Sequence, residues 1–416
     1  LVFVILIIVG IPIAFCMGLS SLFYAFLKGK TALYYLISQK IFVGMDNFVL
    51  ICIPLFILSG MIMNESGITK RLIKFSLSLV GSLKGGLAHV NIVASMFFAG
   101  MTGASTADTA AIGSILIPAM QKEGYDLEFS TGVTVGSSTI GAIIPPSIAM
   151  VTFSVMSGAS IAKLFLAGFI PGVLVGFVQM SIAYVFAVRR NYPIGEKTSL
   201  KKILSNFYDA FFALIMPLII VFGMGFGVFS PTEASAIAVL YSLFVGLVVY
   251  KELDIKKIPA LIFSSSLIAG GILLLISMAT AFGWIMSTEN IPRLFASYLM
   301  MLENKYFILI AINLILLFLG TFLEPQAIII LITPMLLPIA QEIGMSLTNL
   351  GIMVVLNVTL ALLTPPVGMC LYVASGLTGL APEKVAKAAT PFFLGAILVL
   401  IFVTFVPNIT EFIPSL

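Results

Sequence analysis

A long apolar run at residues 88–120 is interrupted at its centre by Phe97-Phe-Ala-Gly-Met-Thr-Gly-Ala-Ser-Thr-Ala-Asp108. Each half of the run has about 15 residues, which corresponds to about 23 Å of helix. That length reaches past the middle of a bilayer but is too short to cross it comfortably. We therefore predict that residues 88–122 form a re-entrant helical hairpin whose tip lies inside the membrane.

The same pattern recurs 220 residues later, where the apolar run 307–340 is interrupted by Gly320-Thr-Phe-Leu-Glu-Pro-Gln326. A second hairpin is therefore predicted at residues 305–341. Six pairs of Gly or Pro share this offset: Gly100 and Gly320, Pro118 and Pro338, Gly124 and Gly344, Pro145 and Pro365, Pro146 and Pro366, Pro171 and Pro391. Gly and Pro are scarce enough, at 35 and 20 of 416 residues, for these coincidences to indicate a duplication.

Each half also contains a double proline inside an apolar segment, in Gly141-Ala-Ile-Ile-Pro-Pro-Ser147 and in Leu363-Thr-Pro-Pro-Val-Gly368. Consecutive prolines remove backbone donors and force the preceding residues out of helical conformation. Broken helices are therefore predicted at residues 126–156 and 346–375. The expected organisation is a first repeat at 1–206, a linking span at 207–230 and a second repeat at 231–416, inserted with opposite orientations.

The composition places the whole chain in a membrane, because 60% of the residues are hydrophobic and only 9% are charged. Soluble domains have about 25% charged residues. The predicted fold class is an all-α polytopic membrane protein built from inverted repeats with two re-entrant hairpins and two broken helices, an architecture typical of secondary transporters. Nine crossings are expected, at residues 1–27, 41–63, 129–156, 161–188, 207–229, 234–250, 259–286, 347–374 and 386–406.

The scarce polar residues exclude several classes of function. The net charge of +4 is scattered, so no basic face for nucleic acid is expected. Three isolated cysteines and one histidine offer neither a disulfide framework nor a metal cluster, and no catalytic constellation is present, so the chain is not expected to be an enzyme. Since the chain begins inside an apolar run without methionine, it is interpreted as a trimmed, processed or distal part of a longer polypeptide.

The distribution of basic residues predicts the orientation. With residues 65–86 in the cytoplasm, fifteen Lys and Arg lie inside and six outside, as the positive-inside rule requires. The N-terminus of this chain is therefore expected in the cytoplasm and the C-terminus on the opposite side.

The hairpin tips and the broken helices are where chemistry is expected. Backbone groups freed at membrane depth must line a polar cavity or bind a ligand. Carbonyl and hydroxyl oxygens suit a small cation, and the N-termini of half-helices suit an anionic substrate. Asp108 and Glu324, one in each tip, are the functional acids by default, although Asp108 has an alternative interpretation as the cap of the following half-helix.

The motifs at the first tip and at both breaks, together with Phe229-Ser-Pro-Thr-Glu-Ala234, resemble the large membrane subunit of tripartite ATP-independent periplasmic (TRAP) transporters. The resemblance covers nearly the whole chain and extends to the ion transporter superfamily of elevator-type carriers. It implies sodium-coupled uptake, across the bacterial inner membrane, of a carboxylate-bearing solute such as a sialic acid or a C4-dicarboxylate. It also implies a periplasmic binding protein and a small four-helix membrane subunit, separate or fused, as partners.

By the same resemblance, sodium binds where each tip meets its break. The first sodium site is implied to contain Thr102, Gly103, Ser105, Asp108, Gly141, Pro145 and Ser147. The second is implied to contain Gly320, Thr321, Glu324, Thr364, Pro365 and Gly368. Four of these residues, Ser105, Asp108, Ser147 and Glu324, are also expected to contact substrate. Ala104 departs from the family, in which serine is common at that position.

Three alternatives remain open at this point. A stand-alone sodium/anion symporter of the same superfamily would need no binding protein. An ion channel would use the hairpins as pore loops, but it would not need repeats of opposite orientation. An intramembrane enzyme would need a catalytic pair, which the sequence lacks. The substrate, the number of sodium ions and the oligomeric state are left open.

Overall fold

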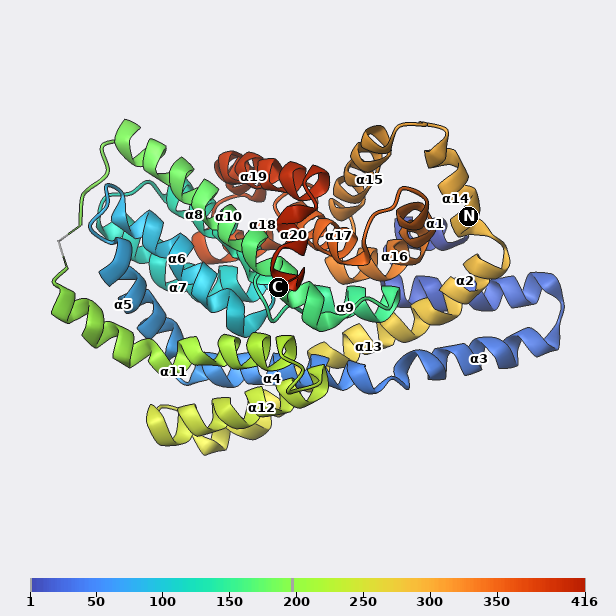
Figure 1. Ribbon diagram of the computed structural model, residues 1–416, viewed down its shortest axis with the longest axis horizontal. Helices are drawn as coiled ribbons and strands as arrows, with labels where there is room; N and C mark the ends of the chain where they lie inside the picture. Colours follow the sequence, from blue (N-terminus) through green and yellow to red (C-terminus); the bar gives the residue numbers. More distant parts are fainter. Residues whose placement is uncertain (1, 196–197, 416) are drawn as a thin grey trace.

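The computed structural model describes residues 2–195 and 198–415, and within these ranges the fold is helical without a strand (Figure 1). Ten helices form what we call the core: α6 Gly86–Thr102, α7 Ser105–Lys122, α8 Leu127–Ser138, α9 Ile148–Ser157, α10 Ile161–Arg189, α15 Lys305–Gly320, α16 Pro325–Glu342, α17 Leu347–Ala361, α18 Met369–Thr378 and α19 Pro382–Phe405. The predicted all-α fold class is confirmed.

Seven helices pack beside the core as an outer layer: α2 Ile13–Lys28, α3 Thr31–Met45, α4 Cys52–Glu65, α5 Ile68–Val80, α11 Leu200–Gly225, α12 Pro231–Phe244 and α13 Ile258–Thr288. Figure 1 shows α2, α3, α4, α12 and α13 running along one side of the molecule. Within this layer α4 packs against α12, and α13 packs against both α2 and α3. Three short helices complete the described chain: α1 Val2–Ile8, α14 Ile291–Met300 and α20 Asn408–Glu411.

Both repeats have the same order of elements. The first repeat contains a hairpin (α6 and α7), a broken helix (α8 and α9) and a long helix (α10). The corresponding elements of the second repeat are the hairpin α15 and α16, the broken helix α17 and α18, and the long helix α19. Each hairpin is preceded by a short amphipathic helix, α5 or α14. The two hairpins and the two broken helices are thus present as the Gly and Pro pattern predicted.

Seven segments of the described chain are long and apolar enough to cross a membrane: Phe48–Glu65, Ile161–Arg189, Leu200–Gly225, Pro231–Val249, Ile255–Thr288, Pro325–Glu342 and Pro382–Phe405. Six of them coincide with predicted crossings. The segment Pro325–Glu342 is α16, the second arm of the second hairpin, so the prediction that each arm is too short to cross is wrong for this arm. The capping box at Ser230–Glu233 begins α12, with the Ser230 hydroxyl accepting a hydrogen bond from the amide of Glu233 and the Glu233 carboxylate accepting one from the amide of Ser230.

Two predicted crossings are not continuous helices. Residues 1–27 are not one helix, because Gly10 has φ +86° and Pro12 begins a new helix at α2. Residues 41–63 are divided at Asp46 and Asn47, where the Asn47 side chain accepts a hydrogen bond from the amide of Val49 and so starts a new helical segment. The preceding helix α3 was therefore missed, and it lies antiparallel beside α2 (Figure 1).

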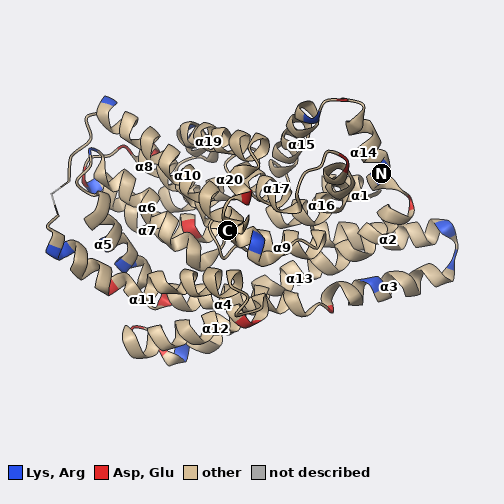
Figure 2. Cartoon of the chain, in the orientation of Figure 1, with Lys and Arg blue, Asp and Glu red and all other residues tan. Residues whose placement is uncertain are grey.

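Most of the basic residues lie toward the ends of the molecule (Figure 2). Figure 2 shows Lys and Arg gathered mainly toward the two ends of the long axis, with tan residues between them. Large apolar side chains cover much of the outer layer, including Phe23 of α2, Tyr208 of α11 and Phe263 of α13, all of which are exposed. This surface matches the apolar interior of a bilayer or another membrane helix.

Candidate functional site

The first hairpin tip packs directly against the first break. A Cβ atom placed on Gly103 would lie 2.6 Å from the carbonyl oxygen of Pro146, and one placed on Gly141 would lie 3.5 Å from the Cβ of Asp108. One on Gly100 would lie 3.5 Å from the carbonyl oxygen of Pro145. We call residues 100–108 and 139–147 the first unit. At Gly103 the tip and the break approach so closely that only glycine fits.

The first unit encloses polar oxygens that have no partner in the described chain. The Asp108 side chain is 0% exposed, and neither of its carboxyl oxygens takes part in a hydrogen bond. The hydroxyls of Thr102 and Ser105 are likewise buried and unpartnered. Buried polar groups are nearly always hydrogen-bonded, and an isolated buried carboxylate is costly. These unpartnered hydroxyl and carboxyl oxygens are hard ligands of the kind that a small cation prefers.

The alternative role of Asp108 as a helix cap is wrong. The N-cap position of α7 is Ala104, which has no side-chain hydrogen bond, and Ser105 begins the helix. Asp108 lies one turn further on, and its own amide donates to the carbonyl of Ala104. Its carboxyl group is thus free to serve a ligand instead of the backbone.

Ser147 holds the break in shape. Its hydroxyl donates to the carbonyl of Ala142 (2.6 Å) and accepts from the amide of Met150 (3.3 Å), so it caps α9. Pro145 lies in the same fully buried turn. Both residues are brought to the first hairpin tip, where Ser147 already has two backbone partners.

A ladder of buried hydroxyl and amide groups supports the first unit, and sequence reasoning missed three of its members, Asn91, Ser95 and Thr134. The Asn91 amide donates to the hydroxyl of Thr134 (2.7 Å), and the Ser137 hydroxyl donates to the Asn91 side-chain oxygen (3.1 Å). The Ser95 hydroxyl donates to that of Ser137 (3.1 Å) and lies beside the Asp108 carboxyl. No local motif marks these residues; only their spacing on the inner faces of α6 and α8 could have indicated the contact.

The second tip also meets its break. The amide of Val367 donates to the carbonyl of Thr321 (3.1 Å), and a Cβ placed on Gly320 would lie 2.1 Å from the Cβ of Ala361. A Cβ placed on Gly368 would lie 2.9 Å from the carbonyl oxygens of both Leu362 and Thr364. We call residues 320–326 and 361–368 the second unit. Two backbone carbonyl oxygens of the second unit therefore lie close to Gly368.

The polar side chains of the second unit are placed differently from those of the first. The hydroxyls of Thr321 and Thr364 each donate to a carbonyl of the preceding helical turn (2.7 Å). Glu324 is exposed at the N-cap position of α16 and caps nothing with its side chain, and Pro365 is exposed beside it. All six predicted residues of the second unit thus lie in one region of the fold. Within it Glu324 and Pro365 are exposed, whereas Gly320 and Gly368 are buried.

A cavity of about 530 Å³ lies between part of the first tip and the outer-layer helices α4 and α13. Its walls are mostly apolar, with polar groups from Asn64 of α4 and from Thr102 and Thr106 of the tip. The Asn64 side-chain oxygen accepts a hydrogen bond from Thr69 (2.8 Å), so its amide nitrogen remains a free donor. The N-terminus of α7 borders the same cavity and has no capping side chain. Asn64 is a functional candidate that sequence reasoning missed.

A second cavity, of about 400 Å³, lies beside the matching part of the other repeat. Gly60-Met-Ile-Met63 precedes Asn64, and Gly283-Trp-Ile-Met286 precedes Ser287, with a shared offset of 223 residues. Ser287, Trp284 and Lys40 line the second cavity. Each copy of this motif therefore borders a cavity between the outer layer and the core.

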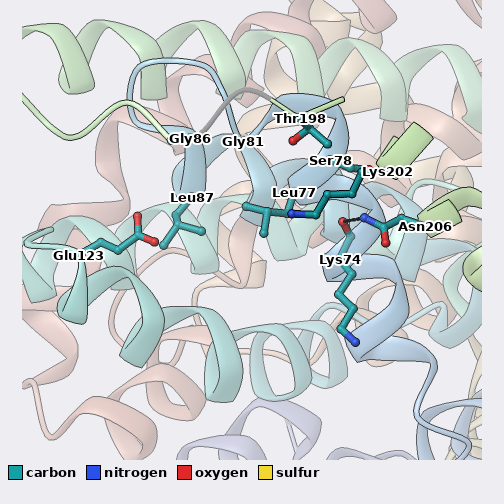
Figure 3. A pocket seen from close by; sticks show the side chains of 11 residues that line it. Lys74, Leu77, Ser78, Gly81, Gly86, Leu87, Glu123, Thr198, Lys202 and Asn206 are labelled. Carbon is teal, nitrogen blue, oxygen red and sulfur yellow. Dashed lines mark hydrogen bonds between the residues drawn. The ribbon is translucent and has the colours of Figure 1, made fainter. Parts of the chain in front are cut away.

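A third hollow, of about 210 Å³, is unrelated to the predicted sites (Figure 3). It lies between α5, the start of α11 and the base of the first hairpin. Figure 3 shows Lys74 and Lys202 on one side and Glu123 on the other, with the Asn206 amide donating to the carbonyl of Lys74 (3.3 Å). None of the predicted site residues lines it.

Comparison with known proteins identifies the family. The family described as "Tripartite ATP-independent periplasmic transporter, DctM component" matches residues 1–409. The chain is 36% identical over 408 residues to the sialic acid TRAP transporter large permease protein SiaM of Vibrio cholerae, covering 98% of this chain and 95% of that protein. It is 37% identical over 377 residues to the C4-dicarboxylate TRAP transporter large permease protein DctM of Pseudomonas aeruginosa, covering 90% and 88%.

The fold also resembles that of a solved transporter. The crystal structure of YdaH from Alcanivorax borkumensis, described as having an unusual topology, matches with a TM-score of 0.61 at 12% identity and covers 90% of each chain. At this identity the match concerns the fold alone. With the family match over nearly its full length, the chain belongs to the DctM family of large permease proteins of tripartite ATP-independent periplasmic transporters.

Proposed function

We propose that this permease drives the uptake of a carboxylate-bearing solute, of the sialic acid or C4-dicarboxylate type, with a sodium gradient. The observation that carries this proposal is the set of buried, unpartnered oxygens of Thr102, Ser105 and Asp108 beside the first break. A bound cation would give these oxygens the partner that the chain does not provide. As a transport subunit, the protein would not be an enzyme.

We propose sodium as the cation that these oxygens bind. Carboxylate, hydroxyl and carbonyl oxygens are hard ligands, whereas softer metals favour thiolate or imidazole ligands. No group of His, Cys, Asp and Glu side chains that could hold a metal ion is found among the described residues. In the second unit, the carbonyls that lie close to Gly368 support a second sodium site, with Thr321, Thr364 and Glu324 around it.

The 530 Å³ cavity is the proposed place for the solute. No lysine or arginine lines it, so the carboxylate would be held by hydrogen-bond donors: the free N–H groups at the start of α7 and the amide of Asn64. Helix N-termini favour negative charge through the helix dipole. Sodium at Asp108 would add a nearby positive charge, which couples solute binding to sodium binding.

An elevator movement is the mechanism that this architecture supports. The core carries both units on inverted repeats, and the outer layer borders a separate cavity beside each repeat. Displacement of the core along the outer layer would expose the sites alternately to the two sides of the membrane. An excess of one positive charge per cycle would supply about 2.3 kcal/mol at 100 mV.

The family description makes the chain one component of a tripartite system. We propose a periplasmic binding protein and a small four-helix membrane subunit as the others, the latter covering part of the apolar outer layer. The proposed location is the bacterial inner membrane, with residues 65–86 and the majority of Lys and Arg on the cytoplasmic side.

Uptake by reconstituted liposomes tests the proposal. The permease with its small subunit and binding protein is expected to accumulate radiolabelled sialic acid or succinate only under an inward sodium gradient. Uptake that does not depend on the sodium gradient would contradict the proposed sodium coupling. Full uptake by this chain alone would favour the stand-alone symporter, and single-channel currents would favour a channel.

A further inference from the structure

A hollow of about 320 Å³ lies where α8, α10 and α19 meet, and the proposed transport function does not use it. Three basic residues, Arg190, Lys384 and Lys387, line it together with one acid, Glu128. Lys384 and Lys387 take part in no ion pair within the described part of the chain. The hollow therefore has positive charge that the described chain does not neutralise.

Two helix N-termini add to this charge. A Cβ placed on Gly132 would lie 2.5 Å from the carbonyl oxygen of Ala388, and one placed on Gly136 would lie 2.5 Å from the Cβ of Phe392. These matched contacts show that α8 and α19 run parallel, so both begin at the end of the molecule that holds the hollow. The N-terminus of a helix carries a partial positive charge.

Arg190 is fixed in this position. One of its terminal nitrogens donates to the Asp126 carboxylate (2.7 Å) and to the Tyr192 hydroxyl (3.3 Å), and the guanidinium lies 5.3 Å from the ring centre of Phe186. The guanidinium has further N–H groups beyond those used here. Asp126 offsets part of the charge of Arg190, and Glu128 is the acid among the residues that line the hollow with the two lysines.

The remaining wall of the hollow is apolar and is formed by Phe129, Phe186, Pro391 and Phe392. Because α10 and α19 are long enough to cross a membrane, this wall continues toward the bilayer interior. A ligand with a phosphate at one end and an alkyl chain at the other matches both parts. Basic pockets between membrane helices bind the headgroups of anionic lipids. We propose that this hollow binds the phosphate of an anionic phospholipid.

Native mass spectrometry of the purified full-length protein tests this assignment, with dioleoyl phosphatidylglycerol and dioleoyl phosphatidylcholine as probes. The wild type is expected to retain phosphatidylglycerol preferentially. The double variant Lys384→Gln with Lys387→Gln should raise its Kd about 30-fold, the loss that two membrane-surface lysines predict. Glu128→Gln should lower the Kd several-fold because it removes the one acid that lines the hollow.

The matched control is a double variant that loses two positive charges outside the hollow. Lys201→Gln with Lys256→Gln removes two exposed lysines outside the hollow, and its Kd should stay within about threefold of the wild type. Equal losses in the two double variants, or an unchanged Kd in Glu128→Gln, would overturn the site. Binding of inorganic phosphate that is lost in the first double variant, with phosphatidylglycerol retention unchanged, would overturn the lipid as the source of the phosphate.

Discussion

The first and second units share one plan but differ in how deeply they are buried. Both bring a hairpin tip against a double-proline break, through contacts that only glycine allows at Gly103 and Gly320. In the first unit the acid, Asp108, is fully buried and unpartnered. In the second unit the acid, Glu324, is exposed, and both threonine hydroxyls are bonded to their own helices.

The difference shows what the outer layer contributes. Gly60 of α4 packs against the first tip, where a Cβ would lie 2.6 Å from the carbonyl oxygen of Met101. The second-unit residues Pro365, Pro366 and Val367 are exposed, so no other described residue covers them in this way. Duplication thus supplies two similar backbone scaffolds, and in this structure the outer layer packs against the first of them.

The largest expected effect is that of Asp108→Asn on sodium. Removing one partner of a buried charge pair costs about 3–5 kcal/mol, so the sodium concentration for half-maximal uptake should rise about 100-fold or more. Sodium titration of uptake in proteoliposomes measures it.

Two matched variants complete this test. Glu324→Gln in the exposed second unit should shift the sodium dependence only about two- to fivefold, because exposed charge pairs contribute about 0.2–1 kcal/mol. Asp209→Asn removes an exposed acid of α11 and should leave uptake unchanged. Equal shifts for Asp108→Asn and Glu324→Gln would show that burial does not distinguish the two units.

Asn64→Ala tests the solute cavity beside the first unit. A hydrogen bond to a charged group contributes about 1.5–3 kcal/mol, so the half-saturating solute concentration should rise about tenfold while maximal uptake at saturating sodium is kept. The measurement is a concentration series of whichever solute, sialic acid or succinate, is transported. Ser287→Ala, at the matching position of the other repeat, is the control; an equal rise there would contradict the assignment of the solute to the first cavity.

Gly103→Ala tests the packing of the first tip on its break. Gly103 has φ +61°, and its added Cβ would meet the Pro146 carbonyl oxygen. Gly344→Ala is the control, because Gly344 has φ +63° and nothing within 4 Å of the added Cβ. In both variants the free energy of unfolding should decrease by about 1–2 kcal/mol, the cost of a non-glycine residue in the left-handed region. Only in Gly103→Ala should it decrease further, because the added Cβ also meets the Pro146 carbonyl oxygen. Thermal unfolding in detergent measures the loss of stability. Equal losses in the two variants would contradict the close packing of the first tip on its break.

Sequence alone predicted the two units because their signals are local. A double proline breaks a helix wherever it stands, and a polar tip such as residues 97–108 is recognisable inside an apolar run. By contrast, α3 was missed because the apolar pattern continues through it, and its end depends on the side chain of Asn47. The roles of Asn64 and Ser95 could not be predicted, because an ordinary polar residue becomes significant only through its tertiary neighbours.

The smallest expected effect concerns the start of the broken helix in each repeat. The N-cap of α8 is Asp126, and that of α17 is Ser346, 220 residues later. The Tyr192 hydroxyl (2.6 Å) and the Arg190 guanidinium (2.7 Å) stabilise the ionised form of Asp126 and lower its pKa. A lowered folded-state pKa contributes stability that is present above the unfolded pKa of about 3.9 and is lost as the pH falls through the folded value.

The unfolding temperature of the wild type should therefore decrease between about pH 5 and pH 3 more steeply than that of Asp126→Asn. Because the ion pair is largely exposed, the difference should be small and should shrink in high salt. Ser346→Ala keeps Asp126 and should show the same acid slope as the wild type, although its own cap is lost. Parallel curves for the wild type and Asp126→Asn would mean that the start of α8 does not depend on this charge, and the two broken helices would then begin in energetically equivalent ways.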